Sequence, residues 1–244
     1  MSAKPVLNIF AHKQQLAVKL AQDFAGLAGE LARSKEQVNI ALSGGSTPTL
    51  FFKAMADLGP EIDWKKIRLY WVDERCVPPG HPESNFGAAK REFLQPLDIP
   101  EDTWSRIRGE DDPGKEAARY GDLIMKNVTP DKSFPVFDII FLGLGTDGHT
   151  ASIFPYQKEL WNAEQLCTVG IHPETGQKRV TFTGQLINAA RKIVFLVTGR
   201  EKSQVAWDVI RRSGQWENYP ASLVAPVRGE LEWYMDRDAA GSLK

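Results

Sequence analysis

Short apolar segments alternate along this chain with longer segments whose apolar residues recur every three or four positions. The first pattern is typical of buried strands and the second of helices that pack by one face. Parallel strands need crossover connections that are usually helical, so the alternation predicts an open, largely parallel α/β sheet with helices on both faces. This length can bury one large core or two small ones, and we favour one domain over residues 1–244.

The pattern assigns the individual elements. We expect strands at 38–42, 67–72, 136–144, 164–170, 179–183, 193–198 and 222–225. We expect helices at 12–32, 115–125 and 199–212, and one more that begins near residues 84–85. A further helix is expected with Thr47 as its N-cap and Pro48 at its first position. Residues 73–75 are expected to end the second strand, and the Pro-, Asp- and Gly-rich residues 94–114 to form a surface connection.

Charge and composition exclude several classes of function. The formal net charge of -1 gives no overall attraction to nucleic acid or to an anionic membrane, so phosphate binding would need a local group of Lys and Arg. No apolar run reaches the roughly 18 residues of a membrane helix, and the N-terminus lacks the apolar region of a signal peptide, so we expect a cytoplasmic protein. Cys76 and Cys167 have neither metal-ligand spacing nor disulfide density, and we expect reduced thiols.

A Gly-rich segment follows the first expected strand, at Ser43, Gly44, Gly45, Ser46 and Thr47. Ligands of open α/β sheets bind outside the carboxyl ends of the strands, which is where this segment lies. Glycines let the backbone approach an anion, N–H groups at a helix start point toward it, and the hydroxyls could add donors. The same letters also suit a plain strand-to-helix turn.

The segment Asp147-Gly148-His149 follows the most apolar strand. A carboxylate two residues from a histidine can orient the imidazole and keep it available as a base. A loop histidine bonded to backbone, with Asp147 as a turn residue, is the alternative.

Charged residues gather at other strand ends. Asp73 could bind a sugar hydroxyl, while Arg75, Arg179 and Lys202 could neutralise a phosphate. Each could equally be an ordinary solvated charge. The histidines have no ligand-like spacing, so we expect no metal site.

Taken together and in order, these segments resemble the 6-phosphogluconolactonase family. The resemblance rests on residues 41–48 (ALSGGSTP), 73–75 (DER), 143–155 (GLGTDGHTASIFP), 179–181 (RVT), 199–202 (GREK) and 220–224 (PASLV). It covers about residues 10–240 and implies a fold like that of glucosamine-6-phosphate deaminase and ribose-5-phosphate isomerase. Cys76 stands where relatives usually carry an aromatic residue, and Gly184 where many carry Pro.

The resemblance also implies an activity and a role for each residue. His149 would be the base and Asp147 its neighbour, residues 44–47 would contact the phosphate with Arg179 and Lys202, and Arg75 would be a mobile cation over the substrate. The expected reaction is hydrolysis of 6-phospho-D-glucono-1,5-lactone to 6-phosphogluconate in the oxidative pentose phosphate pathway. This reaction requires no metal and no organic cofactor. The expected partner is this phosphosugar lactone alone, and we expect a monomer.

Two alternatives stay open. Glucosamine-6-phosphate deaminase-isomerases share the phosphate segment and Asp-Gly-His but carry Glu five residues after the histidine, where this chain has Phe154. A non-catalytic sugar-phosphate sensor would lack the base or add a helix-turn-helix module.

Overall fold

A seven-stranded sheet forms the centre of the computed structural model, which describes residues 5–241. The strand order is β1-β12-β11-β8-β2-β3-β5, and every neighbouring pair is parallel. In that order the strands span Val6–Phe10, Glu230–Asp236, Lys192–Val197, Ile139–Gly143, Val38–Leu42, Ile67–Trp71 and Trp104–Ser105. The parallel α/β sheet expected from the sequence is confirmed.

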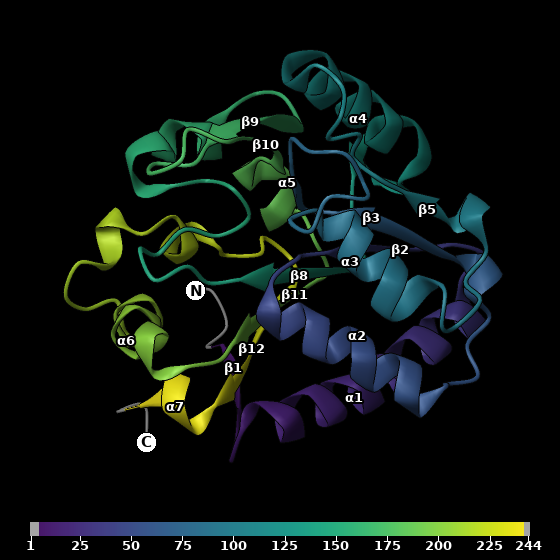
Figure 1. Cartoon of the computed structure of the whole chain (residues 1–244), viewed down its shortest axis with the longest axis horizontal. Coiled ribbons are helices and arrows are strands. Elements are labelled where there is room, and N and C mark those ends of the chain that lie inside the picture. The colour runs from purple at the N-terminus through teal and green to yellow at the C-terminus, as the bar shows by residue number, and fades with distance from the viewer. Residues whose placement is uncertain (1–4, 242–244) are drawn as a thin grey trace.

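The helices lie on both sides of this sheet (Figure 1). Those described are α1 Lys13–Ser34, α2 Ser46–Leu58, α3 Asn85–Ala89, α4 Pro113–Asn127, α5 Gly184–Asn188, α6 Ser203–Arg211 and α7 Arg237–Ala240. On one face Phe24 of α1 packs edge-on against Phe51 of α2 and Phe141 of β8, at 5.5 and 5.7 Å between ring centres. On the other face Phe137 packs against Tyr70 of β3.

A small antiparallel sheet covers part of that second face. It has the order β4-β10-β9 and consists of Asp73–Arg75, Lys178–Phe182 and Cys167–Ile171. Phe182 joins it to the main sheet, because its N–H donates to the carbonyl of Val72 at 2.8 Å and its ring packs on Phe137. A separate pair, β6 Pro130–Asp131 and β7 Phe134–Pro135, lies apart from both sheets.

Residues 73–75 were expected only to end the preceding strand, and this expectation is wrong because they form a strand of their own, β4. The chain leaves the main sheet after Val72 and pairs with β10, so that Asp73 lies opposite Thr181 and Arg75 opposite Arg179. A strand of three residues carries no periodicity of its own, and only its partner reveals it.

The start of α2 differs from the expected one by two positions. Gly45 is the N-cap, with φ +111°, and Thr47 is the second helical residue rather than the cap. Pro48 still fits, since one of the first N–H groups of a helix has no partner in any case.

The expected strand at 222–225 is wrong. Residues Pro220–Leu223 form a short 3-10 segment, held because Ala221 N–H donates to the carbonyl of Gly148 and the side chain of Asn188 bonds Leu223 and Ala225. The last strand is instead β12. Its sequence, ELEWYMD, mixes polar and apolar residues and did not predict a strand, and β1 was not predicted either. The connection at 94–114 contains the edge strand β5.

Candidate active site

A cleft of about 320 Å³ opens at the carboxyl ends of β2, β8 and β11. A volume of this size suits a small ligand. Ten of the eleven site residues expected from the sequence line it, and the remaining one, Asp147, lies directly behind His149. The residues lining the cleft are Ser43, Gly44, Gly45, Ser46, Thr47, Pro48, Asp73, Arg75, Asn85, Gly143, Leu144, Gly145, Thr146, His149, Ala151, Arg179, Leu196 and Lys202.

The N-terminus of α2 forms one wall. Its N-cap Gly45 offers no side chain to the first N–H groups of the helix, so these groups stay available at the cleft. Such a terminus carries a partial positive charge and is a ready anion site. Gly44 is required beside it because a Cβ atom there would lie 1.8 Å from Oδ1 of Asn85.

The three hydroxyls of this segment are not equivalent. Ser43 is buried and donates to the carbonyl of Phe141 at 2.8 Å, so its proton is already used. Thr47 is also buried and shares a hydrogen bond of 2.7 Å with the hydroxyl of Thr198. Only Ser46 is exposed, and its hydroxyl is the one in this group that a ligand meets freely.

His149 and Asp147 form a bonded pair. Nδ1 of His149 lies 2.5 Å from Oδ1 of Asp147, which also accepts the backbone N–H of His149 at 3.1 Å. The loop is tight: Gly145 N–H donates to the carbonyl of His149, and Gly148 adopts φ +83° against the ring of Tyr219.

The protonation of this pair follows from its contacts. Burial alone would raise the pKa of the Asp147 carboxyl, but the hydrogen bond and charge of His149 together lower it below the ordinary value. An ionised carboxylate only accepts, so Nδ1 carries the hydrogen. The lone pair of a neutral imidazole is then on Nε2, and His149 lines the cleft.

Asp73 is a buried carboxylate at the side of the cleft. Its Oδ2 accepts the hydroxyl of Ser152 at 2.6 Å, and its backbone carbonyl accepts the side-chain amide of Asn85 at 2.9 Å. Sequence reasoning gave Ser152 and Asn85 no role. The order Ser-Asn after an acidic strand end is the signal that could have indicated the second of them.

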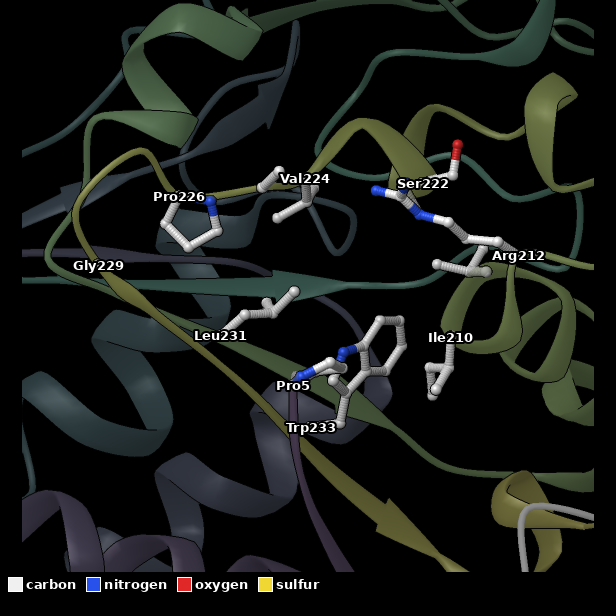
Figure 2. Close-up of a pocket in the computed structure, with 12 residues that line it drawn as sticks. Pro5, Ile210, Arg212, Ser222, Val224, Pro226, Gly229, Leu231 and Trp233 are labelled. Carbon is white, nitrogen blue, oxygen red and sulfur yellow. The ribbon is translucent and has the colours of Figure 1, made fainter. Parts of the chain in front are cut away.

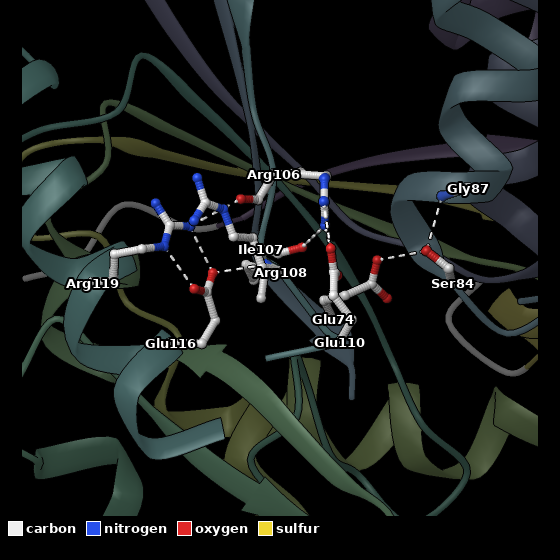
Figure 3. A network of polar contacts seen from close by, with 9 residues as sticks. All are labelled: Glu74, Ser84, Gly87, Arg106, Ile107, Arg108, Glu110, Glu116 and Arg119. Carbon is white, nitrogen blue, oxygen red and sulfur yellow. Dashed lines mark hydrogen bonds and ion pairs between the residues drawn. The ribbon is translucent and has the colours of Figure 1, made fainter. Parts of the chain in front are cut away.

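Glu74 has a structural role in the loop that follows. It is 1 % exposed and accepts the N–H groups of Arg75, Asn85 and Phe86 at 2.8 Å each. Figure 3 shows the Ser84 hydroxyl donating to the same carboxylate while it caps the N–H of Gly87. Burial raises the pKa of Glu74, and these donors oppose that rise.

A second buried carboxylate, Glu116, holds the loop that packs against β4. Glu116 of α4 pairs with Arg119 and accepts the N–H of Arg108 at 2.7 Å (Figure 3). The same loop carries Gly109, where a Cβ atom would lie 2.4 Å from the carbonyl oxygen of Arg75. The backbone of Arg75 is therefore packed tightly from this side.

Arg75 and Arg179 face each other across β4 and β10. Arg75 donates through Nη1 to the carbonyl of Glu83 at 2.6 Å, and its Nε is buried without a partner among the described residues. Burial lowers the pKa of Arg179; Asp73 opposes this and the charge of Arg75 adds to it. Like charges at directly paired positions repel, so an anion between them would be stabilised.

Lys202 approaches the cleft from the other side, at the end of the 3-10 segment Arg200–Lys202 after β11. Burial lowers its pKa, and the charges of Glu201 and Asp236 oppose that shift. Within residues 5–241 no carboxylate lies close enough to form an ion pair with Lys202. Its charge is available to a ligand.

A cavity of about 200 Å³ between Trp233, Val224 and Arg212 is mainly apolar and holds no candidate base (Figure 2). Among the described residues there is no cluster of three His, Cys, Asp or Glu side chains arranged to hold a metal ion. In the same part of the chain, every helix is too short or too polar to cross a membrane.

Comparisons with known proteins agree with this geometry. The chain is 45 % identical over 200 residues to the 6-phosphogluconolactonase of Treponema pallidum, covering 75 % of this chain and 83 % of that protein. It is 38 % identical to the Haemophilus influenzae 6-phosphogluconolactonase, covering 94 % and 96 %. The structure of the Trypanosoma brucei 6-phosphogluconolactonase superposes with a TM-score of 0.86 at 26 % identity over 100 % of both chains. Residues 11–233 match the model of the family described as glucosamine-6-phosphate isomerases/6-phosphogluconolactonase, and the chain belongs to that family.

Proposed function

We propose that this chain hydrolyses 6-phospho-D-glucono-1,5-lactone to 6-phosphogluconate, the lactonase step of the oxidative pentose phosphate pathway. The observation that carries the proposal is one cleft that joins an oriented histidine base to a helix N-terminus and three cations. The names of the similar proteins support the same reaction. We further propose that residues 1–244 act as one catalytic domain, as a monomer in the cytoplasm.

In this proposal His149 is the general base. Nε2 takes a proton from a water molecule, whose oxygen attacks the lactone carbonyl carbon while the carbonyl oxygen gains negative charge. The bond from that carbon to the ring oxygen then breaks, and the ring oxygen receives the proton from the imidazolium. Asp147 holds Nδ1–H throughout, which fixes the tautomer and stabilises the protonated ring.

The cations and the helix terminus have separate roles in substrate binding. The N-terminus of α2, the Ser46 hydroxyl and Lys202 form the wall that suits a phosphate group. Arg75 and Arg179 stand on the wall built by the small sheet, next to the buried carboxylate of Asp73. Asp73 accepts hydrogen bonds and so suits a sugar hydroxyl.

Ring-opening of an amino sugar is less well supported. That reaction would need a polar side chain at position 154 as the acid–base partner of His149. Phe154 is instead a fully buried hydrocarbon ring. The remaining carboxylate near the base, Asp147, is already bonded to Nδ1.

The decisive experiment measures acid release from freshly made 6-phosphogluconolactone with and without the purified chain. Lactone opens spontaneously, so early time points and a blank are required. We expect catalysed opening and no ammonia release from glucosamine 6-phosphate. Ammonia release without lactone hydrolysis would assign the deaminase reaction, and inactivity on both with tight binding would assign a sensor.

A further inference from the structure

Phe154 lies five residues after the base and is fully buried, and it packs against two residues that line the cleft, His149 and Arg179. It directly precedes the 3-10 segment Pro155–Asn162, with extended backbone angles of φ −92° and ψ 157°. Its ring is in contact with the side chains of His149, Arg179, His172 and Tyr156. Among the described residues, no other aromatic ring contacts both the proposed base and a cation of the cleft.

The contact with His149 supplies a constraint that the Asp147 bond does not. The two ring centres are 4.7 Å apart, at an angle of 47° between the planes. A single hydrogen bond at Nδ1 holds one edge of the imidazole but leaves the ring free to tilt about that edge. Packing of one face against Phe154 removes this freedom and fixes the direction of Nε2.

The contact with Arg179 restrains a charge. The guanidinium carbon lies 5.7 Å from the centre of the Phe154 ring, within the range of a cation–π interaction. Within the described part of the chain, the side chain of Arg179 makes one hydrogen bond, from Nε to Gln177 at 3.4 Å, and it faces the like charge of Arg75. The aromatic ring therefore adds a restraint on this guanidinium.

We propose that Phe154 is a positioning residue that holds the base His149 and the cation Arg179 in fixed relation to each other. The proposal rests on the function proposed above. One ring touches both groups, so a movement of the ring displaces both, and a displacement of about 1 Å in such groups can cost 10²-fold in rate. A ring that served only as core packing would affect stability and leave both groups where they are.

The test compares Phe154→Leu with Phe93→Leu. Phe93 is equally buried, but its ring contacts are with Phe51, Phe52 and Trp64 rather than with His149 and Arg179. Both variants lose one buried ring, so both should lower Tm to a similar extent. We expect Phe154→Leu to lower kcat about tenfold and to raise KM several-fold, and Phe93→Leu to leave both within about twofold.

Two further measurements separate positioning from general damage. Phe154→Tyr keeps the ring and should recover most of the lost kcat. Nitrogen-15 relaxation NMR of the imidazoles reports ring motion without any turnover: we expect an ordered His149 ring in wild type and Phe93→Leu, a mobile ring in Phe154→Leu, and the Nδ1–H tautomer in all three.

The outcomes distinguish this proposal from the proposed function on which it rests. If Phe154→Leu matches Phe93→Leu in kcat, KM and NMR signal, Phe154 is core packing and the inference is overturned. If wild-type protein fails to hydrolyse the lactone, the proposed function falls, and the NMR comparison still decides whether Phe154 positions the imidazole.

Discussion

Gly145 lies so close to the bonded pair His149 and Asp147 that a Cβ atom at this position would be 2.1 Å from Nδ1 of His149. The same atom would lie 2.5 Å from Oδ1 of Asp147, and Gly145 also donates its N–H to the carbonyl of His149. The hydrogen bond of the pair therefore depends on the absence of a side chain here.

Gly145→Ala should separate Asp147 from His149 and lower kcat by roughly 10²-fold, because the imidazole loses its orientation. Steady-state kinetics with blank subtraction measure this. Gly26→Ala in α1 is the control, since a Cβ there meets nothing within 4 Å. Unchanged kcat in a folded Gly145→Ala protein would mean that the pair does not govern the reaction.

His149→Ala should keep the fold and lower kcat by ~10²-fold or more, since general-base catalysis is worth 10²- to 10⁴-fold. The side chain is polar and 27 % exposed, so its removal deletes little apolar contact beyond that with Phe154. Circular dichroism and kcat should be measured on the same preparation. A folded variant with near wild-type kcat would move the search for the base to Asp73.

Arg179→Ala and Lys202→Ala should each raise KM strongly, because each removes a cation from the cleft. Arg200→Ala is a matched control: this side chain is 87 % exposed and belongs to the same 3-10 segment as Lys202. Gluconolactone without phosphate should be a poor substrate of the wild type. Equal kcat/KM for the two lactones would refute phosphate recognition.

The lowered pKa of Asp147 gives stability a pH dependence with a definite sign. Below the ordinary value of 3.8 the unfolded chain binds the proton more readily than the folded chain, so stability rises with pH through that window. The stabilisation is complete above 3.8 and is lost as pH falls through the lowered folded value. Denaturant titrations of wild type and Asp147→Asn should therefore differ by a constant amount near neutrality and converge in acid.

Chelators should leave turnover intact, because the proposed water activation uses only an imidazole and a carboxylate. The test is exhaustive treatment with EDTA or phenanthroline before the lactone assay. Loss of activity that returns on adding Zn²⁺ or Mg²⁺ would show that a metal activates the water.

The sequence predicted the main sheet and the location of the cleft because both follow from local patterns. Strands such as Val38–Leu42 are continuous apolar runs, and polar, Gly-rich segments mark their carboxyl ends. It did not predict β12, whose alternating polar letters are typical of a half-exposed strand rather than of one paired on both sides. It also missed β4, which exists only through its pairing with β10.

Within the site, residue types could be predicted but their bonding could not. Ser43 and Ser46 look alike in the sequence, yet only the structure distinguishes the hydroxyl bonded to Phe141 from the exposed one. Ser152 lies 79 residues from Asp73, so no local pattern links them. Phe154 was noted only as the absence of a glutamate, and its ring contacts come from the fold.

The opposed arginines of the small sheet have a consequence for the protein without ligand. Arg75 and Arg179 repel each other, and the charge of Arg179 is partly removed from water. This repulsion is relieved when an anion lies between them, so ligand binding and thermal resistance are coupled. The two arginines therefore lower conformational stability, and the same repulsion favours the binding of an anion.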